Sequence, residues 1–304
     1  MKEIKEQFQF KKIHKATIEL ITKINEILEE YQKQGYTCTI RQIYYQLVSQ
    51  NIISNNIEEY QKISRTIGDA RLNGLIDWNA IEDRTRYIRR TQFWDNPTDF
   101  KKSVIPQYKI DIWEGQQYYV EIWCEKDALI GIVEKSCEEY RVPFFSCRGY
   151  PSLSMLYETA QRIIRNGREA IIFHLGDADS TGLDVTRNIT EQLQLLTKNK
   201  HPKIINVERI GLSIEQAESL KLPSQPMKTS DRRSKKFQEK HGSERVYELD
   251  AVTPAILDSW IQTAFNKYVD KDELEKWKCL EYNERETLYT NWIVPYLLPR
   301  EKLY

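Results

Sequence analysis

Apolar side chains near the amino terminus recur at intervals of three and four residues, which is the spacing of amphipathic helices. Two such stripes predict helices over residues 13–33 and 58–73. Between them a helix begins at Thr39, whose hydroxyl fits a capping box with the side chain of Gln42. Residues 75–78 predict a short strand. Three helices and a short strand in this order predict a winged helix-turn-helix.

The third of these helices presents basic side chains outward, among them Lys62 and Arg65. Residues 84–90 follow the predicted wing and add four positive charges, which include Arg84 and Arg86. Positive side chains beside a helix-turn-helix can track DNA phosphates. We therefore expect these four residues to contact DNA. A three-helix packing domain with a solvated, charged face is the alternative.

Two adjacent tyrosines, Tyr44 and Tyr45, lie on the second predicted helix. At about 100° per residue, Tyr44 falls within the apolar face, whereas Tyr45 lies roughly 130° from the centre of that face. We expect Tyr44 to be a core residue and Tyr45 to reach solvent or a ligand. Arg41 precedes Tyr45 by one turn and would place a guanidinium beside it. An ordinary surface tyrosine is the alternative for Tyr45.

From about residue 117 the pattern changes to short apolar runs that alternate with helical stretches. The strands that these runs predict cover residues 118–124, 143–147, 170–175 and 203–207. Strands and helices that alternate in this way predict a parallel sheet with helices on both faces. The expected fold class is therefore α/β. A winged helix-turn-helix domain would cover residues 1–105, and a Rossmann-like parallel-sheet domain with a C-terminal extension would cover residues 106–304.

Three carboxylates follow strands of this sheet: Glu125 after the first strand, and Asp177 and Asp179 after the third. The carboxyl ends of parallel strands form the ligand crevice of such a fold. Carboxylates gathered there repel one another unless a cation neutralises them, and hard oxygen ligands suit Mg²⁺. Helix capping is the alternative, although it explains one aspartate and not three acids. His174, inside the third strand, is expected to be a buried core residue.

The charge balance, the lengths of the apolar stretches and the cysteine spacing exclude several classes of protein. Lysine plus arginine and aspartate plus glutamate number 45 each, so the formal net charge is zero. This excludes a uniformly basic surface but leaves room for a local basic groove. We find neither a stretch of roughly 20 apolar residues nor a secretory signal. The five cysteines have no CxxC spacing, so we expect no disulfide framework, no zinc site and a cytoplasmic location.

Several motifs resemble those of a known family. They are Glu125-Lys126-Asp127-Ala128, Arg148-Gly149-Tyr150-Pro151 and the stretch from Gly176 to Asp184, GDADSTGLD. Together they are similar to the Toprim domain of the topoisomerase VI A subunit and of its relative, the meiotic double-strand-break transesterase. The segment from Thr39 to Tyr45, TIRQIYY, resembles the nucleophile motif that this family carries on a winged helix. The stretches Arg209–Leu212 and Glu248–Ala251 resemble its later elements.

The resemblance implies an activity and a role for each matching residue. The substrate would be double-stranded DNA, and the product a 5′-phosphotyrosyl break. In the family, the tyrosine of one protomer works with the acidic site of the other, so a homodimer is implied. The implied residues are Tyr45 as nucleophile and Glu125, Asp177 and Asp179 as Mg²⁺ ligands. Beside these, we expect Arg41 and Glu125 to take part in catalysis and Lys126 and Arg148 to contact DNA.

The chemistry of tyrosine is consistent with this assignment. A phenol with a pKa of about 10 is only about 0.1% ionised at pH 7. It therefore needs a base, a cation or metal-ordered water to become a competent nucleophile. Arg41 can stabilise the charge that develops on the phenolate or the phosphate, and Mg²⁺ can polarise the phosphate.

Other functions and two unassigned segments stay open. Toprim chemistry also serves nucleases that hydrolyse DNA with water, as in anti-plasmid defence, and a non-catalytic DNA-binding scaffold is a third possibility. The sequence contains no Walker A loop, so strand passage would need a separate ATPase subunit. Residues 228–245 carry a local excess of four positive charges and predict either a DNA-contacting loop or a solvated one. The acidic, aromatic segment 270–304 has no assigned role.

Overall fold

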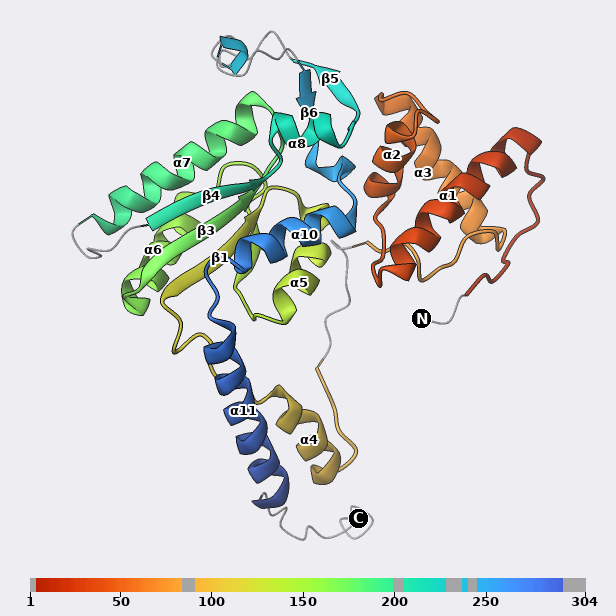
Figure 1. The fold of residues 1–304 in the computed structure, drawn as a ribbon. Helices are drawn as coiled ribbons and strands as arrows, with labels where there is room; N and C mark the ends of the chain where they lie inside the picture. The colour runs from red at the N-terminus through yellow and green to blue at the C-terminus, as the bar shows by residue number, and fades with distance from the viewer. Residues whose placement is uncertain (1–3, 84–90, 199–204, 228–236, 240–244, 292–304) are drawn as a thin grey trace. The chain divides into compact units, whose positions relative to one another are not determined.

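The computed structural model describes residues 4–83, 91–198, 205–227, 237–239 and 245–291, whose helices and strands are labelled in Figure 1. The chain divides into two compact units. One unit comprises residues 1–87 and 118–267, and the other comprises residues 88–117 and 268–304. This grouping differs from the expected boundary between residues 105 and 106, because the second unit joins two stretches that lie far apart in the sequence.

The amino-terminal helices form where the apolar spacing predicts them. Helix α1 spans Lys15–Lys33, α2 spans Ile40–Ser49 and α3 spans Ile57–Leu72. The capping box at the start of α2 is confirmed. The Thr39 hydroxyl accepts a hydrogen bond from the backbone N–H of Gln42 at 3.3 Å, and the Thr39 backbone N–H donates to the Gln42 side chain at 2.8 Å. The buried faces of the three helices share one apolar core.

The predicted strand at residues 75–78 is wrong, because this segment forms a turn around a buried carboxylate. Asp77 accepts hydrogen bonds from the backbone N–H groups of Ile4 and Asn79, at 2.9 and 3.0 Å, and from the Gln32 side chain at 2.9 Å. A side chain thus satisfies backbone groups that a wing would have paired between strands. Within residues 4–83, only isolated bridges occur, and no wing of paired strands is present.

A four-stranded parallel sheet forms the centre of the same unit. Its strands are β1 (Tyr118–Cys124), β2 (Phe144–Ser146), β3 (Glu169–Leu175) and β4 (Ile205–Gly211). They lie in the order β2-β1-β3-β4, and every neighbouring pair is parallel. The predicted parallel sheet is therefore confirmed, although β4 continues beyond its predicted end at residue 207.

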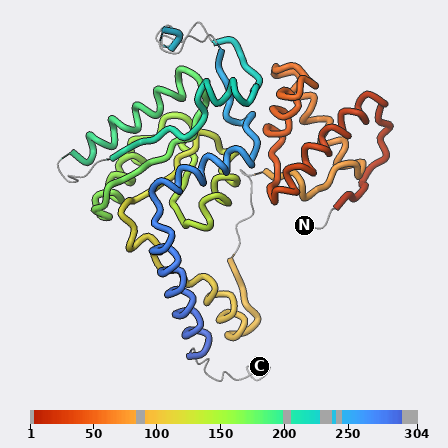
Figure 2. The backbone as a smooth tube through the Cα atoms, in the orientation of Figure 1, coloured from red at the N-terminus to blue at the C-terminus, as the bar shows by residue number. Residues whose placement is uncertain are grey.

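Helices cover both faces of this sheet, as the alternation of strands and helices predicts (Figure 1). The helices are α6 (Leu153–Asn166) and α7 (Ser180–Thr197) on one face, and α5 (Ile130–Glu138) and α10 (Pro254–Phe265) on the other. Figure 2 shows α10 beside α5, although the two are far apart in the sequence. This α/β arrangement is compatible with a Rossmann-like domain.

Shorter elements complete the unit near the carboxyl ends of the strands. They are the 3-10 turns η2 (Asp127–Leu129) and η3 (Leu249–Ala251), helix α8 (Ile214–Ser219) and the antiparallel pair β5 (Ser224–Pro226) and β6 (Arg245–Tyr247). The main-chain groups of Ala178, after β3, and Tyr247, at the end of β6, exchange hydrogen bonds of 2.9 and 3.2 Å. This pairing brings the segment that follows β6 to the loop that follows β3.

The second unit is built around helix α11 (Lys271–Asn291), which lies beside α4 (Pro97–Val104) in Figure 1 and contacts the turn η1 (Ile105–Gln107). The buried carboxylate of Glu281 accepts a hydrogen bond from the backbone N–H of Ile110 at 3.0 Å and pairs with Lys109 at 3.4 Å. Residues 270–291 of the acidic segment therefore pack against residues that precede β1. The remainder of that segment, residues 292–304, lies outside the described residues.

His174 lies in the core of the first unit, as the sequence predicts. His174 is fully buried, with its Nδ1 atom 2.8 Å from the Thr186 hydroxyl. Burial and the nearby Arg209 lower the pKa of His174 to about 3, so the ring is neutral, and the expected core role is confirmed. All five cysteines are free. None of the described helices is long and apolar enough to cross a membrane.

One buried ion pair ties the sheet to a covering helix. Glu121 of β1 is 1% exposed, and Arg162 of α6 reaches both of its carboxylate oxygens at 2.8 and 3.1 Å. Tyr119 and Trp123 donate to the same carboxylate at 2.5 and 2.9 Å. Each oxygen of this buried charge is therefore satisfied.

Replacing Arg162 by methionine is expected to lower the free energy of unfolding by about 3 kcal/mol, because it strands a buried carboxylate. Urea titration followed by circular dichroism measures the change. The matched control is Arg165→Met, the same substitution at an exposed position of α6. A loss no larger in Arg162→Met than in Arg165→Met would contradict the proposed importance of the pair.

The turn at Asp77 predicts a pH dependence of stability. Burial raises the pKa of Asp77, but hydrogen bonds from Ile4 and Asn79 lower it by more, so the net pKa lies below its usual value. A carboxyl with a depressed folded pKa stabilises the protein above its unfolded pKa of about 3.9, and this contribution is lost as the pH falls through the folded pKa. Asp77→Asn should therefore cost about 1–2 kcal/mol at pH 7. The difference from wild type should shrink below about pH 4; a constant difference from pH 7 to pH 3 would count against it.

Candidate active site

The carboxyl ends of β1 and β3 place two of the predicted acids together. Cys124 lies opposite Leu175 where the two strands end. Beyond that point, the Glu125 backbone N–H donates to the Leu175 carbonyl at 2.8 Å, and the Glu125 carboxylate accepts from the Asp177 N–H at 3.2 Å. A Cβ atom at Gly176 would lie 2.7 Å from a carboxylate oxygen of Glu125. A larger residue at this position would have to displace the end of the Glu125 side chain.

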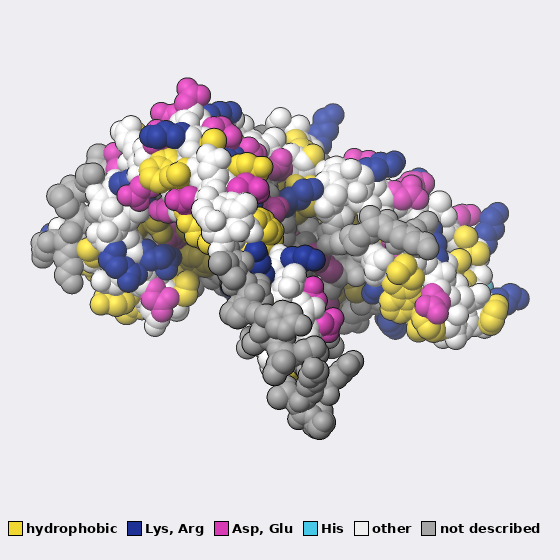
Figure 3. All heavy atoms as spheres, turned by 90° about the horizontal axis from the view of Figure 1, so that it is seen from below, with side chains coloured by type: hydrophobic (Ala, Val, Ile, Leu, Met, Phe, Trp, Pro, Cys, Tyr) yellow, Lys and Arg dark blue, Asp and Glu magenta, His cyan; other side chains and the backbone are white. Residues whose placement is uncertain are grey.

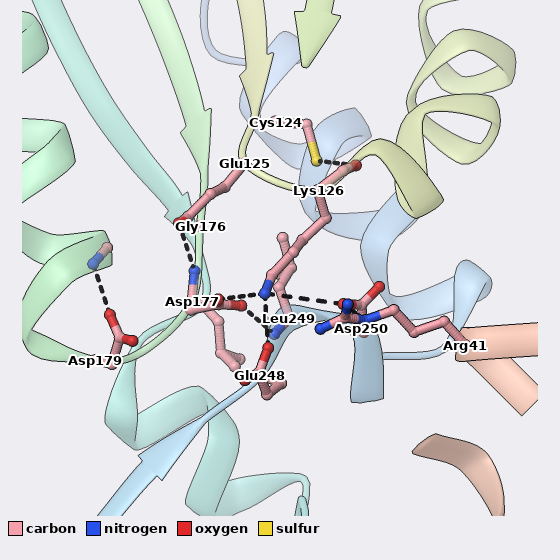
Figure 4. Close-up of polar contacts among 12 residues, drawn as sticks. Arg41, Cys124, Glu125, Lys126, Gly176, Asp177, Asp179, Glu248, Leu249 and Asp250 are labelled. Carbon is pink, nitrogen blue, oxygen red and sulfur yellow. Dashed lines mark hydrogen bonds and ion pairs between the residues drawn. The ribbon is translucent and has the colours of Figure 1, made fainter. Parts of the chain in front are cut away.

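The third predicted acid has a different local role. The Asp179 carboxylate accepts a hydrogen bond from the Gly182 N–H at 2.6 Å and caps helix α7. Figure 4 shows this side chain directed toward α7 and away from Lys126. The helix-capping alternative is thus confirmed for Asp179, and its service as a metal ligand stays a prediction.

Lys126 lies among Asp177 and two further acids, Glu248 and Asp250, to which sequence reasoning assigned no role. Its Nζ atom lies 2.5 Å from Asp177, 2.6 Å from Glu248 and 3.9 Å from Asp250 (Figure 4). The backbone N–H of Leu249 donates to the other Asp177 oxygen at 2.8 Å, which fixes η3 against this loop. We call Asp177, Glu248 and Asp250 the acidic cluster. For Glu248 and Asp250, the sequence signal is that residues 248–251 resemble a family motif.

Burial disfavours the ionised forms of the carboxylates around Lys126. Burial raises the pKa of Asp177 to about 7, although Lys126 opposes this effect. Burial likewise raises the pKa values of Asp250 and Glu125 above those of exposed carboxyls. Burial lowers the pKa of Lys126, but the three carboxylates raise it by more, so the ammonium stays charged. The site therefore favours a cation at this position.

Arg209, in another stretch that resembles the family, has a scaffolding role here. Its guanidinium donates to the carbonyls of Gly176, Asp177 and Gly182 at 2.8, 2.5 and 2.9 Å. Burial lowers its pKa to about 10, with the neighbouring carboxylates opposing the shift. These hydrogen bonds hold the β3–α7 loop that carries the acids.

Helix α2 brings Arg41 and Tyr45 to the same site. The side chain of Gln46 donates to the Ala251 carbonyl at 3.3 Å, and the Nε of Arg41 lies 3.3 Å from an oxygen of Asp250. The Arg41 guanidinium lies 5.7 Å from the centre of the Tyr45 ring, so the expected neighbourhood of the two side chains is confirmed. In Figure 4 Arg41 points toward Asp250.

The expectation that Tyr45 reaches solvent is wrong for this chain, since Tyr45 is only 6% exposed. The angular positions along α2 predict burial only against its apolar face. In the structure η3 also packs against α2, which is a tertiary contact that these positions do not include. Burial raises the pKa of Tyr45 to about 12, with Glu248 adding to the shift and Arg41 opposing it. Tyr44 is a core residue as predicted, and its hydroxyl donates to Asn55 at 2.9 Å.

A cavity of about 610 Å³ opens beside these groups. Its basic lining residues are Arg41, Arg71, Lys126 and Arg148, and Glu125 and Asp250 are among its acids. Such a mixed lining can hold a phosphate near carboxylates that bind a cation. The cavity has both charge types that phosphoryl-transfer chemistry requires.

The remaining predicted DNA contacts are dispersed. Lys62 and Arg65 are exposed on α3, where Lys62 pairs with Glu59 at 3.2 Å. The Arg148 side chain is also largely exposed and pairs with Asp127 at 2.6 Å. On the face seen in Figure 3, acidic and basic side chains of the described residues are interspersed. Arg84, Arg86 and most of residues 228–245 lie outside the described residues.

Comparison with known proteins adds no family assignment. No protein-family model matches this chain, and no curated protein sequence matches it significantly. The geometry of the site and the motifs that it contains therefore carry the functional argument.

The donor atoms of the site are chemically suited to Mg²⁺. All of them are carboxylate oxygens, the ligand type that this ion prefers. Asp250 is fully buried, and neither of its oxygens has a hydrogen-bond partner among the described residues. Within the described residues, no preassembled group of three or more metal ligands occurs, and Lys126 lies among these acids. The donor types fit the ion, whereas the Lys126 ammonium occupies the position between Asp177 and Glu248.

Alanine substitutions at Gly182, which contacts the Asp177 backbone, and at Gly68, on α3, are expected to change stability in opposite directions. A Cβ atom at Gly182 would lie 2.3 Å from the Asp177 carbonyl oxygen, whereas one at Gly68 meets nothing within 4 Å. Gly182→Ala should therefore destabilise the protein by about 1–3 kcal/mol. Gly68→Ala, in the interior of α3, should stabilise it by up to about 1 kcal/mol. Thermal unfolding measures both, and equal effects of the two substitutions would refute the close approach at Gly182.

Proposed function

We propose that this chain is a Mg²⁺-dependent DNA-cleaving enzyme of the topoisomerase VI A-subunit type, with a Toprim domain and Tyr45 as its nucleophile. The observation that carries the proposal is the position of α2. This helix sets Tyr45 and Arg41 beside a carboxylate cluster at the carboxyl ends of β1 and β3. A nucleophile, a phosphate-stabilising cation and candidate metal ligands are thereby neighbours within one chain, whereas the motif resemblance implies that the tyrosine acts with the acidic site of a second protomer.

In the proposed reaction, the Tyr45 hydroxyl attacks a backbone phosphorus. The Tyr45 O–P bond forms as the P–O3′ bond breaks; the phenolic proton passes to a base, and the departing 3′-oxygen takes up a proton. The result is a 5′-phosphotyrosyl link and a free 3′-hydroxyl, which reseals the strand by the reverse attack. Because the covalent link conserves the phosphodiester, religation needs no external energy source.

The protein's own groups supply most of the required catalysis. Arg41 stabilises negative charge on the phenolate and the phosphate. Glu125 and Asp177 would hold Mg²⁺, with Asp179 as the third ligand that the motif resemblance implies. The bound ion would polarise a phosphate oxygen. Cutting both strands requires two tyrosines, so the enzyme would act as a homodimer on double-stranded DNA, and strand passage would require a separate ATPase subunit.

Metal-dependent hydrolysis of DNA is the second candidate. It is favoured by the burial of Tyr45 and by the pKa of about 12 of its phenol, both of which oppose its use as a nucleophile in this conformation. A hydrolytic Toprim nuclease would use the same carboxylates and the same cavity but would not require Tyr45. The two candidates therefore differ in one testable residue.

The expected result with supercoiled plasmid and Mg²⁺ is a protein-linked break. After denaturation in detergent, cleaved DNA should enter a gel only when the sample is also treated with protease. Tyr45→Phe should reduce this product by about a thousandfold or more, because it removes the nucleophile. Tyr44→Phe is the matched control, since it removes a hydroxyl that bonds Asn55; it should retain cleavage.

Each contrary outcome has a defined meaning. Free nicked or linear DNA that is produced equally well by Tyr45→Phe would establish hydrolysis in place of transesterification. DNA binding without cleavage, in the presence of Mg²⁺ and with the protein folded, would support the scaffold alternative. Chelation of the metal should abolish cleavage in either catalytic mode.

A further inference from the structure

The acidic cluster is only partly satisfied by the cation that lies in it. The Lys126 ammonium contacts Asp177 and Glu248 at 2.5 and 2.6 Å but lies 3.9 Å from Asp250. Arg41 approaches Asp250 to 3.3 Å from the other side. Among the ion pairs of the cluster itself, three ionised carboxylates exceed these two cations by one negative charge.

Asp250 gives an independent indication that a ligand belongs here. Its side chain is fully buried, and both of its oxygens lack a hydrogen-bond partner within the described part of the chain. A buried carboxylate without hydrogen bonds is costly to maintain. Figure 4 shows Asp250 directed toward Lys126 and Arg41. The unsatisfied oxygens thus face the position of the lysine ammonium.

We propose that Lys126 is a built-in substitute for a divalent cation in a site formed by Asp177, Glu248 and Asp250, and that binding of the metal displaces it. The inference rests on the proposed metal dependence of the enzyme and adds Glu248 and Asp250 to the expected metal ligands. Replacing the single charge of the ammonium by a double charge cancels the remaining negative charge of the cluster. It also gives the Asp250 oxygens a ligand, since they have no hydrogen-bond partner within the described residues and meet Arg41 only as an ion pair at 3.3 Å.

The lysine has a place to go when it is displaced. Its side chain is long, it is partly exposed, and it lines the cavity of about 610 Å³ beside the cluster. Arg41, Arg71 and Arg148 line the same cavity. Released into this space, the ammonium would add a fourth positive charge where we expect a DNA phosphate. Metal binding and phosphate binding would then strengthen one another.

The test measures metal affinity directly, without DNA. The full chain is titrated with Mn²⁺, which takes the same oxygen ligands as Mg²⁺ and can be followed by the electron paramagnetic resonance signal of the free ion. Lys126→Met should bind Mn²⁺ about tenfold more tightly than wild type, or better, because the competing charge is gone. Lys23→Met is the control: it removes an exposed lysine that also pairs with a carboxylate, Glu26, and should leave the affinity unchanged.

A second substitution tests whether the metal binds at the acidic cluster. Adding Asp250→Asn to Lys126→Met should reverse the gain in affinity. If Lys126→Met does not fold, as judged by circular dichroism, Lys126→Gln keeps a polar side chain without the charge and serves the same comparison. Unchanged Mn²⁺ affinity in the folded lysine variant would overturn the proposal, as would a gain that survives Asp250→Asn.

The outcome can be separated from that of the proposed function. Tyrosine-dependent cleavage of plasmid by the wild type, together with an unchanged Mn²⁺ affinity in Lys126→Met, would reject the lysine substitution alone. Tighter Mn²⁺ binding by Lys126→Met without any DNA cleavage would uphold the site and reject the proposed activity.

Discussion

The burial of several carboxylates at one edge of a parallel sheet is the constraint around which this site is organised. Carboxylates out of water are tolerated only when cations or hydrogen bonds compensate them. Lys126 supplies the nearest positive charge to Asp177 and Glu248, and Arg41 supplies one to Asp250. Arg209 meanwhile anchors the main chain of the same loop through carbonyl oxygens. The local structure therefore follows from charge compensation.

The same compensation connects the helical segment to the sheet. Arg41 belongs to α2, and its contact with Asp250 lies next to the hydrogen bond from Gln46 to Ala251. Docking of α2 on η3 buries Tyr45, which raises its pKa, and places it beside a guanidinium that opposes the rise. The conformation thus keeps the phenol protonated while holding it next to groups that could activate it. As the proposed nucleophile, Tyr45 would react only after DNA or metal alters its surroundings.

Lys126 links the fold to the proposed chemistry. It lies two residues beyond the end of β1, which positions its backbone. Its flexible side chain can reach either the acidic cluster or the adjoining cavity. A point charge on a long side chain suits such an exchange better than the rigid fork of an arginine would. The neighbouring Glu121–Arg162 pair is the contrasting case, because every oxygen of that carboxylate is satisfied within the fold. The acidic cluster around Lys126 therefore keeps carboxylate oxygens that can bind a ligand, and the Glu121–Arg162 pair does not.

Local sequence determined the elements and the acids nearest the strands. Apolar periodicity predicted α1, α2, α3 and the four parallel strands, because the repeat of buried positions depends on helix or strand geometry alone. The position of Glu125 and Asp177 followed from the same argument, since parallel strands end at one edge. Tertiary structure decided the rest. Asp77 turned a predicted strand into a turn through contacts with Ile4 and Gln32, and η3 covered Tyr45 and delivered Asp250. These contacts join residues far apart along the chain, and no local pattern of hydrophobic and polar residues encodes which distant charge will meet which.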